Sequence, residues 1–310
     1  MKRFLIHIVS IAALFIGILI ILDLTYTTIF CRTKNKTKLN WVLNMHNQTV
    51  DYIIVGSSRV LFHIDADMIN DSTNQVGYNL GEPDFGLNET LLLLKIFYEQ
   101  GNQVRNVFIQ LDNNWNESEP NELGAASFMP FLYKTTIRKH YNQWGTKYRL
   151  YSSIPFIRYM YYAKSIGFRQ LINSVFNDRA RSSTYGYDYL SGQINIKEIE
   201  KESFIPMADN SQIQEMKKLT MANKSQAIFF TAPILKFNPL DFDLLAKIID
   251  HYTNFANNVS DSKLFFDSIH LNEEGAEIFT RNFMHCYFKN TNLTYQTDKN
   301  RTNGLEGQAL

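Results

Sequence analysis

The sequence predicts an α/β protein in which helices cover a parallel sheet. Short runs rich in β-branched and aromatic residues stand at 52–55, 107–111, 227–231 and 264–266, and longer stretches of helical character separate them. Strands that alternate with helices are typical of a parallel sheet, because each helical crossover returns the chain to the same edge. The 310 residues, 45% of them hydrophobic, are enough for one sizeable core.

Four stretches are expected to be helices. The first runs from about 87 to 100, and the second from about 212 to 222. Asn238 followed by Pro239 predicts the start of a third, because the asparagine can cap a helix and proline fits its first turn. The last is expected from Glu273 to Tyr287 and completes the set.

The segment 124–187 breaks this alternation and predicts a helical insertion, for which we expect bounds of 124–205. The segment is rich in tyrosine and carries ten basic residues against one acid, Asp178, a balance of +9; since the whole chain is +1, the rest is −8. The basic residues are Lys134, Arg138, Lys139, Lys147, Arg149, Arg158, Lys164, Arg169, Arg179 and Arg181.

Two interpretations of this aromatic and basic segment stay open. The charge asymmetry indicates an anionic partner, either an acidic glycan whose rings stack on the tyrosines or the anionic surface of a membrane. Alternatively, the aromatic side chains form a core and the basic ones are solvated. No motif that reads nucleic acid is present, so no nucleic-acid partner is expected.

The segment 4–22 is almost continuously apolar and predicts a membrane span, because it is long enough to cross a hydrocarbon core of about 30 Å. Lys2 and Arg3 before it also fit a cleaved signal peptide. That alternative is disfavoured by the length of the run and by bulky Tyr26 and Phe30 where a signal peptidase prefers small residues.

Two short motifs far apart in the chain predict a serine nucleophile and its base. Gly-Ser-Ser-Arg occupies 56–59 and Asp-Ser-Ile-His-Leu-Asn occupies 267–272, each directly after an expected strand. Ligands of open α/β sheets bind at the carboxyl ends of the strands. A serine hydroxyl needs an imidazole to take its proton, and a carboxylate fixes the tautomer of that imidazole. Asp267, three residues before His270, can do so within one turn.

Both motifs resemble blocks of the SGNH (GDSL-like) hydrolase superfamily, which has Gly-x-Ser after its first strand and Asp-x-x-His before its final helix. The resemblance implies a flavodoxin-like fold with Ser58 as nucleophile, His270 as base, Asp267 as its partner and Ser57 at the variable position. The Gly-Ser-Ser-Arg form is especially similar to membrane-anchored, extracytoplasmic members associated with the modification of cell-surface polysaccharides.

Two further blocks are weaker. Tyr-Asn-Leu-Gly at 78–81 is similar to the block whose glycine N–H helps to form the oxyanion hole, which implies Gly81. The third block, Gly-x-Asn-Asp, lacks its glycine and its aspartate here; counting from the preceding strand places Asp112 at the glycine and Asn114 at the asparagine, with Asn113 as second choice. The expected donors to a developing oxyanion are the N–H groups of Ser58 and Gly81 and the amide of Asn114.

Each motif also has a purely structural interpretation. Gly-Ser-Ser occurs in many loops, and Asp-x-x-His before a helix can be an aspartate turn with Asn272 as the helix cap. The conjunction of blocks in the right order favours the catalytic interpretation.

Two classes of function follow. The first is a serine esterase or O-acyltransferase that acts on acyl esters of a cell-surface glycan. The alternative is a non-catalytic, membrane-tethered binding or assembly protein with the same fold. No Cys/His cluster has the spacing of a metal site and no glycine-rich phosphate loop is present, so neither a metal nor a cofactor is expected.

The expected organisation is a membrane anchor at 1–30, a juxtamembrane linker at 31–50, a catalytic domain at 51–290 and a disordered polar tail at 291–310. Basic residues flank both ends of the apolar segment, and the positive-inside rule alone favours a cytoplasmic domain. The family resemblance implies the opposite, and we expect a single-pass membrane protein with its catalytic domain outside the cytoplasm.

Overall fold

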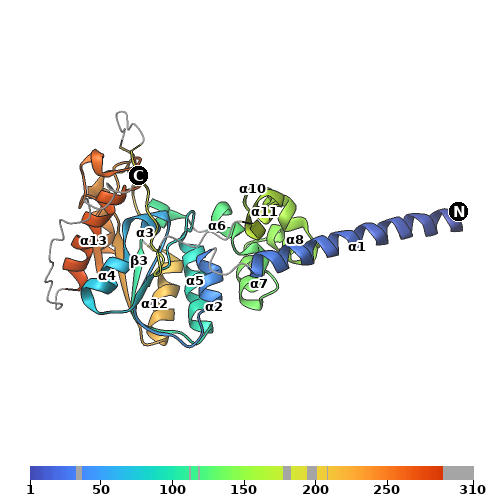
Figure 1. Ribbon diagram of the computed structural model, residues 1–310, viewed down its shortest axis with the longest axis horizontal. Helices are drawn as coiled ribbons and strands as arrows, with labels where there is room; N and C mark the ends of the chain where they lie inside the picture. Colours follow the sequence, from blue (N-terminus) through green and yellow to red (C-terminus); the bar gives the residue numbers. More distant parts are fainter. Residues whose placement is uncertain are drawn as a thin grey trace, which may run out of the picture.

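A five-stranded parallel sheet, in the order β2-β1-β3-β4-β5, lies inside the larger body of the protein, on the left of Figure 1. The computed structural model describes residues 1–32, 37–111, 113–117, 119–176, 183–193, 201–207 and 209–288, so the tail expected at 291–310 lies outside the described residues. The strands are β1 (Thr49–Val55), β2 (Gly77–Asn79), β3 (Gln103–Gln110), β4 (Gln226–Thr231) and β5 (Tyr252–Asn254).

Helices cover both faces of this sheet, as the alternating pattern predicts. Val107 and Phe229 face one apolar cluster, whereas Phe108 and Phe230 face another and pack against Phe283, with ring centroids 5.1 and 5.2 Å away. The helices beside the first cluster are α2 (Lys38–Asn44), α5 (Leu87–Glu99) and α12 (Ser211–Ala222), and those beside the second are α3 (Ser58–His63), α4 (Ala66–Thr73) and α13 (Glu273–Tyr287).

The four expected helices are present, and the third of them is a 3-10 helix, whereas the other three are α-helices. Residues 239–247 form a 3-10 helix, η3 (Pro239–Lys247), which Asn238 caps by accepting a hydrogen bond from the N–H of Leu240. In the linker expected at 31–50, residues 38–44 form α2, and β1 already begins at Thr49.

The prediction of a strand at 264–266 is wrong. The chain there forms a 3-10 turn, η4 (Ser262–Leu264), and Phe265 makes only an isolated antiparallel bridge to Leu271. Phe265 is fully buried in the cluster beside α13, so the apolar run reflects burial and not sheet pairing. The sequence pattern indicated neither β2 nor β5, the two short strands at the edges of the sheet.

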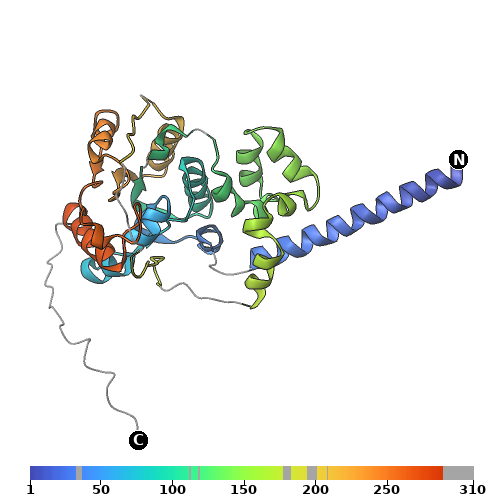
Figure 2. The same cartoon turned by 90° about the horizontal axis from the view of Figure 1, so that it is seen from above.

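The N-terminal helix α1 (Lys2–Arg32) projects from the body of the protein in both views (Figures 1 and 2). Its 31 residues make it about 46 Å long, at 1.5 Å per residue. It is long and apolar enough to cross a membrane, and its most apolar stretch is not buried against the rest of the protein.

The C-terminal third of α1 is docked into the helical insertion. Asp23 accepts hydrogen bonds from the N–H of Phe156, at 2.6 Å, and from Arg158, at 2.8 Å. Phe30 is buried and stacks on Tyr159 with 6.2 Å between ring centroids. The elements between β3 and α12 are η1 (Asn113–Asn116), α6 (Glu122–Ala126), η2 (Met129–Phe131), α7 (Thr135–Asn142), α8 (Thr146–Ser153), α9 (Ile157–Tyr161), α10 (Ala163–Ile166) and α11 (Phe168–Phe176).

Five tyrosines of the insertion form its core, which supports the structural interpretation of that segment. These five are Tyr141, Tyr148, Tyr151, Tyr159 and Tyr162, whereas Tyr187 is buried in the cluster on the other face of the sheet. They pack edge to face or tilted, with centroid distances such as 5.1 Å between Tyr141 and Tyr148. These rings are therefore not available to stack on a glycan, in contrast to exposed Tyr133 and Tyr161.

Candidate active site

The structure brings Ser58, His270 and Asp267 into one chain of hydrogen bonds. Ser58 Oγ lies 2.8 Å from His270 Nε2, although the two residues are 212 positions apart in the sequence. His270 Nδ1 lies 2.9 Å from Asp267 Oδ2. When Nδ1–H donates to the carboxylate, Nε2 is left as an acceptor for the serine hydroxyl, which is the tautomer that nucleophilic catalysis requires.

The turn between β1 and α3 presents Ser58 and not Ser57. Gly56 has φ +152°, and a Cβ on it would lie 2.6 Å from Gln110 Oε1, so no larger residue fits. Ser57 is the N-cap of α3, where its Oγ accepts from the N–H of Arg59, and both its N–H and its hydroxyl donate to Gln110 Oε1 at 3.0 Å. Ser58 is the first residue of α3, and its hydroxyl meets the imidazole.

Asp267 serves both the turn and the imidazole, each through a separate oxygen. Its Oδ1 accepts from the N–H groups of Ile269 and His270, each at 2.8 Å, while Oδ2 faces the ring. Burial raises the pKa of Asp267, but the hydrogen bonds from the ring and the two backbone groups outweigh it and leave the pKa below its usual value. The aspartate turn and the expected catalytic contact are therefore compatible.

Asn272 caps α13 as expected, accepting a hydrogen bond from the N–H of Gly275 at 3.0 Å.

His63 was not predicted and supports the loop that carries His270. It is fully buried at the end of α3, and its Nε2 accepts from the N–H of Leu271 at 3.0 Å. Burial above all, with the charges of Arg59 and His270, holds the pKa of His63 well below its usual value. Its ring therefore stays neutral and keeps an acceptor for the residue next to His270.

Arg59 explains the last position of the Gly-Ser-Ser-Arg motif. Its side chain is buried beneath the nucleophile turn, and Nη1 donates to the main-chain oxygen of Ala232 at 3.0 Å. Burial lowers its pKa to about 9, so the guanidinium is charged at neutral pH. The residue ties α3 to the segment that follows β4.

Of the three expected oxyanion donors, the N–H of Ser58 fits best. It is at the first position of α3, where the backbone N–H has no partner within the helix, and it donates no hydrogen bond to another described residue. Such a group can donate to a substrate oxygen that is bonded to the carbon under attack by Oγ.

Gly81 does not fit its expected role. Its N–H donates to Asn79 Oδ1 at 3.0 Å, and a Cβ on it would lie 2.5 Å from Val60 Cβ. Asn79 is buried as well, and its Nδ2 donates to the main-chain oxygens of Val60 and Ile64. The glycine is thus required for the close approach of this segment to α3, and its N–H is committed within the fold. The second block implied the N–H of Gly81 as an oxyanion donor, and this expectation is corrected because that N–H already donates to Asn79.

Asn114 and Asn113 both lie on η1, after β3. Asn113 is exposed, whereas Asn114 is half-buried, and its Oδ1 is buried without a hydrogen-bond partner among the described residues. Its Nδ2 donates no hydrogen bond to another described residue and can donate to a ligand, and its partly buried position favours Asn114 over the exposed Asn113. Asp112, expected at the glycine position of the block, lies outside the described residues.

No protein-family model matches the chain, and no curated protein is detectably similar to it in sequence. Among the residues that the structure describes, no group of three His, Cys, Asp or Glu side chains could hold a metal ion. The site is a hydrogen-bonded series of a serine hydroxyl, an imidazole and a carboxylate.

Proposed function

We propose that the protein is a membrane-anchored serine esterase or O-acyltransferase of the SGNH type, which acts on acyl esters of a cell-surface glycan. The observation that carries the proposal is the hydrogen-bonded series from Ser58 Oγ through His270 to Asp267. Two features support the SGNH type: the order of the motifs along the chain, and a strand order that is the one of flavodoxin-like folds.

The reaction transfers an acyl group from one oxygen to another. Ser58 Oγ attacks the ester carbonyl carbon while His270 Nε2 takes the hydroxyl proton, and Asp267 stabilises the imidazolium. Nε2 then returns this proton to the leaving alcohol as its C–O bond breaks, which leaves an acyl ester on Ser58. In the second half, water or a sugar hydroxyl gives its proton to Nε2 and attacks the acyl carbon, and Ser58 leaves as the restored hydroxyl.

Negative charge develops on the carbonyl oxygen in both halves. The N–H of Ser58 and the amide of Asn114 are the proposed donors to it. One such donor typically lowers the barrier by roughly 3 kcal/mol, because it is already oriented before the reaction.

We further propose that α1 is retained as a single-pass anchor and that the domain lies outside the cytoplasm. Cleavage of α1 as a signal peptide would separate Asp23 and Phe30 from the insertion residues against which they pack. The extracytoplasmic side follows from the family resemblance and suits a glycan substrate.

The direct test is labelling of the full-length protein in detergent with a fluorophosphonate probe, which reacts with activated serines, followed by mass spectrometry of the labelled peptide. An adduct on Ser58 supports the proposal. Absence of labelling under conditions in which a known serine hydrolase reacts would favour the non-catalytic binding or assembly protein.

A further inference from the structure

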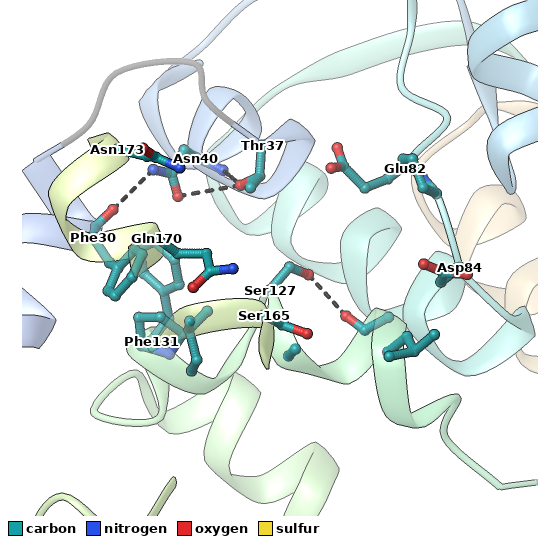
Figure 3. Close-up of a pocket in the computed structure, with 16 residues that line it drawn as sticks. Phe30, Thr37, Asn40, Glu82, Asp84, Ser127, Phe131, Ser165, Gln170 and Asn173 are labelled. Carbon is teal, nitrogen blue, oxygen red and sulfur yellow. Dashed lines mark hydrogen bonds between the residues drawn. The ribbon is translucent and has the colours of Figure 1, made fainter. Parts of the chain in front are cut away.

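A cavity of about 730 Å³ lies where the anchor, α2, the segment after β2 and the insertion meet (Figure 3). Glu82 and Asp84 form one side of it, and amide side chains of α11 lie opposite. Hydroxyl groups from the insertion stand between the two sides. These polar side chains are Glu82, Asp84, Ser127, Ser165, Gln170 and Asn173.

The chemistry of this lining selects the ligand. Ionised carboxylates only accept hydrogen bonds, whereas amides and hydroxyls both donate and accept. No Lys or Arg is among the described residues that line the cavity, so the two carboxylates disfavour an anionic ligand. A ligand with many neutral hydroxyl groups can donate to Glu82 and Asp84 and also accept from Gln170 and Asn173. We propose that this cavity binds a saccharide that carries no acidic group.

The acidic side of the cavity is continuous with the nucleophile turn. The N–H of Glu82 donates to the main-chain oxygen of Gly56, at 3.1 Å, two residues before Ser58. The carboxylate of Glu82 accepts from the N–H of Lys38 at 2.7 Å, which joins the same residue to the start of α2. The cavity lining therefore includes a residue that is hydrogen-bonded directly to the turn before the proposed nucleophile.

Close backbone packing fixes α6 of the insertion against the acidic side of the cavity. Asp84 has φ +62°, a left-handed conformation that aspartate and asparagine adopt more readily than most residues. A Cβ on Gly124 of α6 would lie 2.4 Å from the main-chain oxygen of Asp84. Only glycine allows this approach, so the insertion is seated directly against the acidic segment.

The cavity also lies near the end of the predicted span. Phe30 lines it and is eight residues beyond Leu22, which corresponds to about 12 Å along the helix axis. A saccharide bound there is close to the membrane surface. Binding of a saccharide in this cavity does not depend on the proposed function. Its role in the reaction, as part of the ester substrate or as the acyl acceptor, rests on the proposed function.

The test is calorimetric titration of the full-length protein in detergent with neutral trimers of glucose, galactose and N-acetylglucosamine. A trimer of galacturonic acid serves as the anionic control. We expect at least one neutral trimer to bind more tightly than this control. Binding of none of the neutral trimers, or tighter binding of the galacturonic acid trimer, would overturn the proposal.

Variants locate the binding. Asp84→Asn keeps the shape and tolerates the left-handed backbone, and together with Asn173→Ala it should weaken binding about tenfold or more. The matched control Asp71→Asn, on the exposed side of α4, should leave the affinity unchanged. Equal affinity of the cavity variant and the control would contradict the cavity as the site.

The result of the saccharide titration can be distinguished from the result of the labelling experiment that tests the proposed function. Ser58→Ala should bind the trimer as the parent does, because the nucleophile does not line the cavity. Fluorophosphonate labelling of Ser58 without saccharide binding would overturn the cavity proposal alone. Saccharide binding without labelling would support the cavity and count against the acyl-transfer chemistry.

Discussion

The side-chain oxygen of Gln110, at the end of β3, accepts two hydrogen bonds from Ser57, one from its N–H and one from its hydroxyl, each at 3.0 Å. This pair fixes the turn that precedes the nucleophile and assigns different roles to neighbouring serines. Ser57 is a structural cap, and Ser58 is the group that contacts the imidazole.

The two serines should therefore respond differently to substitution. Ser58→Ala should abolish labelling by a fluorophosphonate, because the reactive oxygen is gone. Ser57→Ala should keep most of the labelling and lower the free energy of unfolding by roughly 1 kcal/mol, the usual effect of losing a helix cap. Peptide mapping and urea unfolding measure the two effects. An adduct on Ser57 would shift the proposed register by one residue.

Asp267→Asn should lower kcat by about 10³-fold to 10⁴-fold with little change in KM. The asparagine Oδ1 can still accept from the N–H groups of Ile269 and His270, so the turn is kept. Its amide would then donate to His270 Nδ1 and force the proton onto Nε2, which could no longer accept from Ser58. Steady-state kinetics with a small acetyl ester would measure this effect.

A double variant tests whether the two residues act as a unit. His270→Ala should cost at least as much as Asp267→Asn, and the combination should be little worse than His270→Ala alone. If the two losses multiply, Asp267 does not act through His270.

Glu89 predicts a pH-dependent stability that is independent of catalysis. Burial raises the pKa of this carboxyl to about 7, partly offset by hydrogen bonds that include one from the N–H of Gly86. Its pKa in the unfolded chain is about 4.3, so between these values the folded state keeps a proton that the unfolded state has lost. The free energy of unfolding should therefore fall as the pH rises from about 4.5 to 7, by an amount on the order of 3 kcal/mol.

Glu89→Gln should remove that dependence, because the amide oxygen can still accept from Gly86 and does not titrate. The variant should be more stable than the parent at pH 8 and about equal to it at pH 5, as measured by urea unfolding in detergent. Glu117→Gln, in an exposed position, is the control and should follow the parent at both pH values. Parallel curves for the parent and Glu89→Gln would refute the assignment.

The sequence was sufficient to predict the layered fold and the contact of three side chains. Ser58 follows β1 in a local pattern, and Asp267 with His270 forms a turn that needs only four residues. The apolar run at 264–266 was misinterpreted because a segment buried beside α13 has the same composition as a short strand.

The supporting residues could not be predicted. Gln110 contacts Ser57 across 53 positions, and His63 contacts Leu271 across 208, so no local spacing marks either pair. Gly81 matched a motif but is required for close packing, which a motif alone does not distinguish from an oxyanion donor.

The docked end of α1 leads to a prediction about truncation. Full-length protein should remain with membranes after a carbonate wash, and a chain that begins at Asp23 should be released because it lacks the apolar run.

A chain that begins at Lys38 also loses Tyr26 and Phe30, both of which are buried in the insertion. Its Arg158 is left partly buried without the carboxylate of Asp23. We expect this shorter chain to be less stable than the one from Asp23 by at least about 3 kcal/mol, the typical effect of removing one buried large aromatic side chain. Thermal unfolding and size-exclusion chromatography of the two chains measure the difference. Equal stability of the two shorter chains would mean that the last third of α1 does not hold the insertion in place. Recovery of the full-length chain in the soluble fraction after the carbonate wash would contradict the membrane assignment.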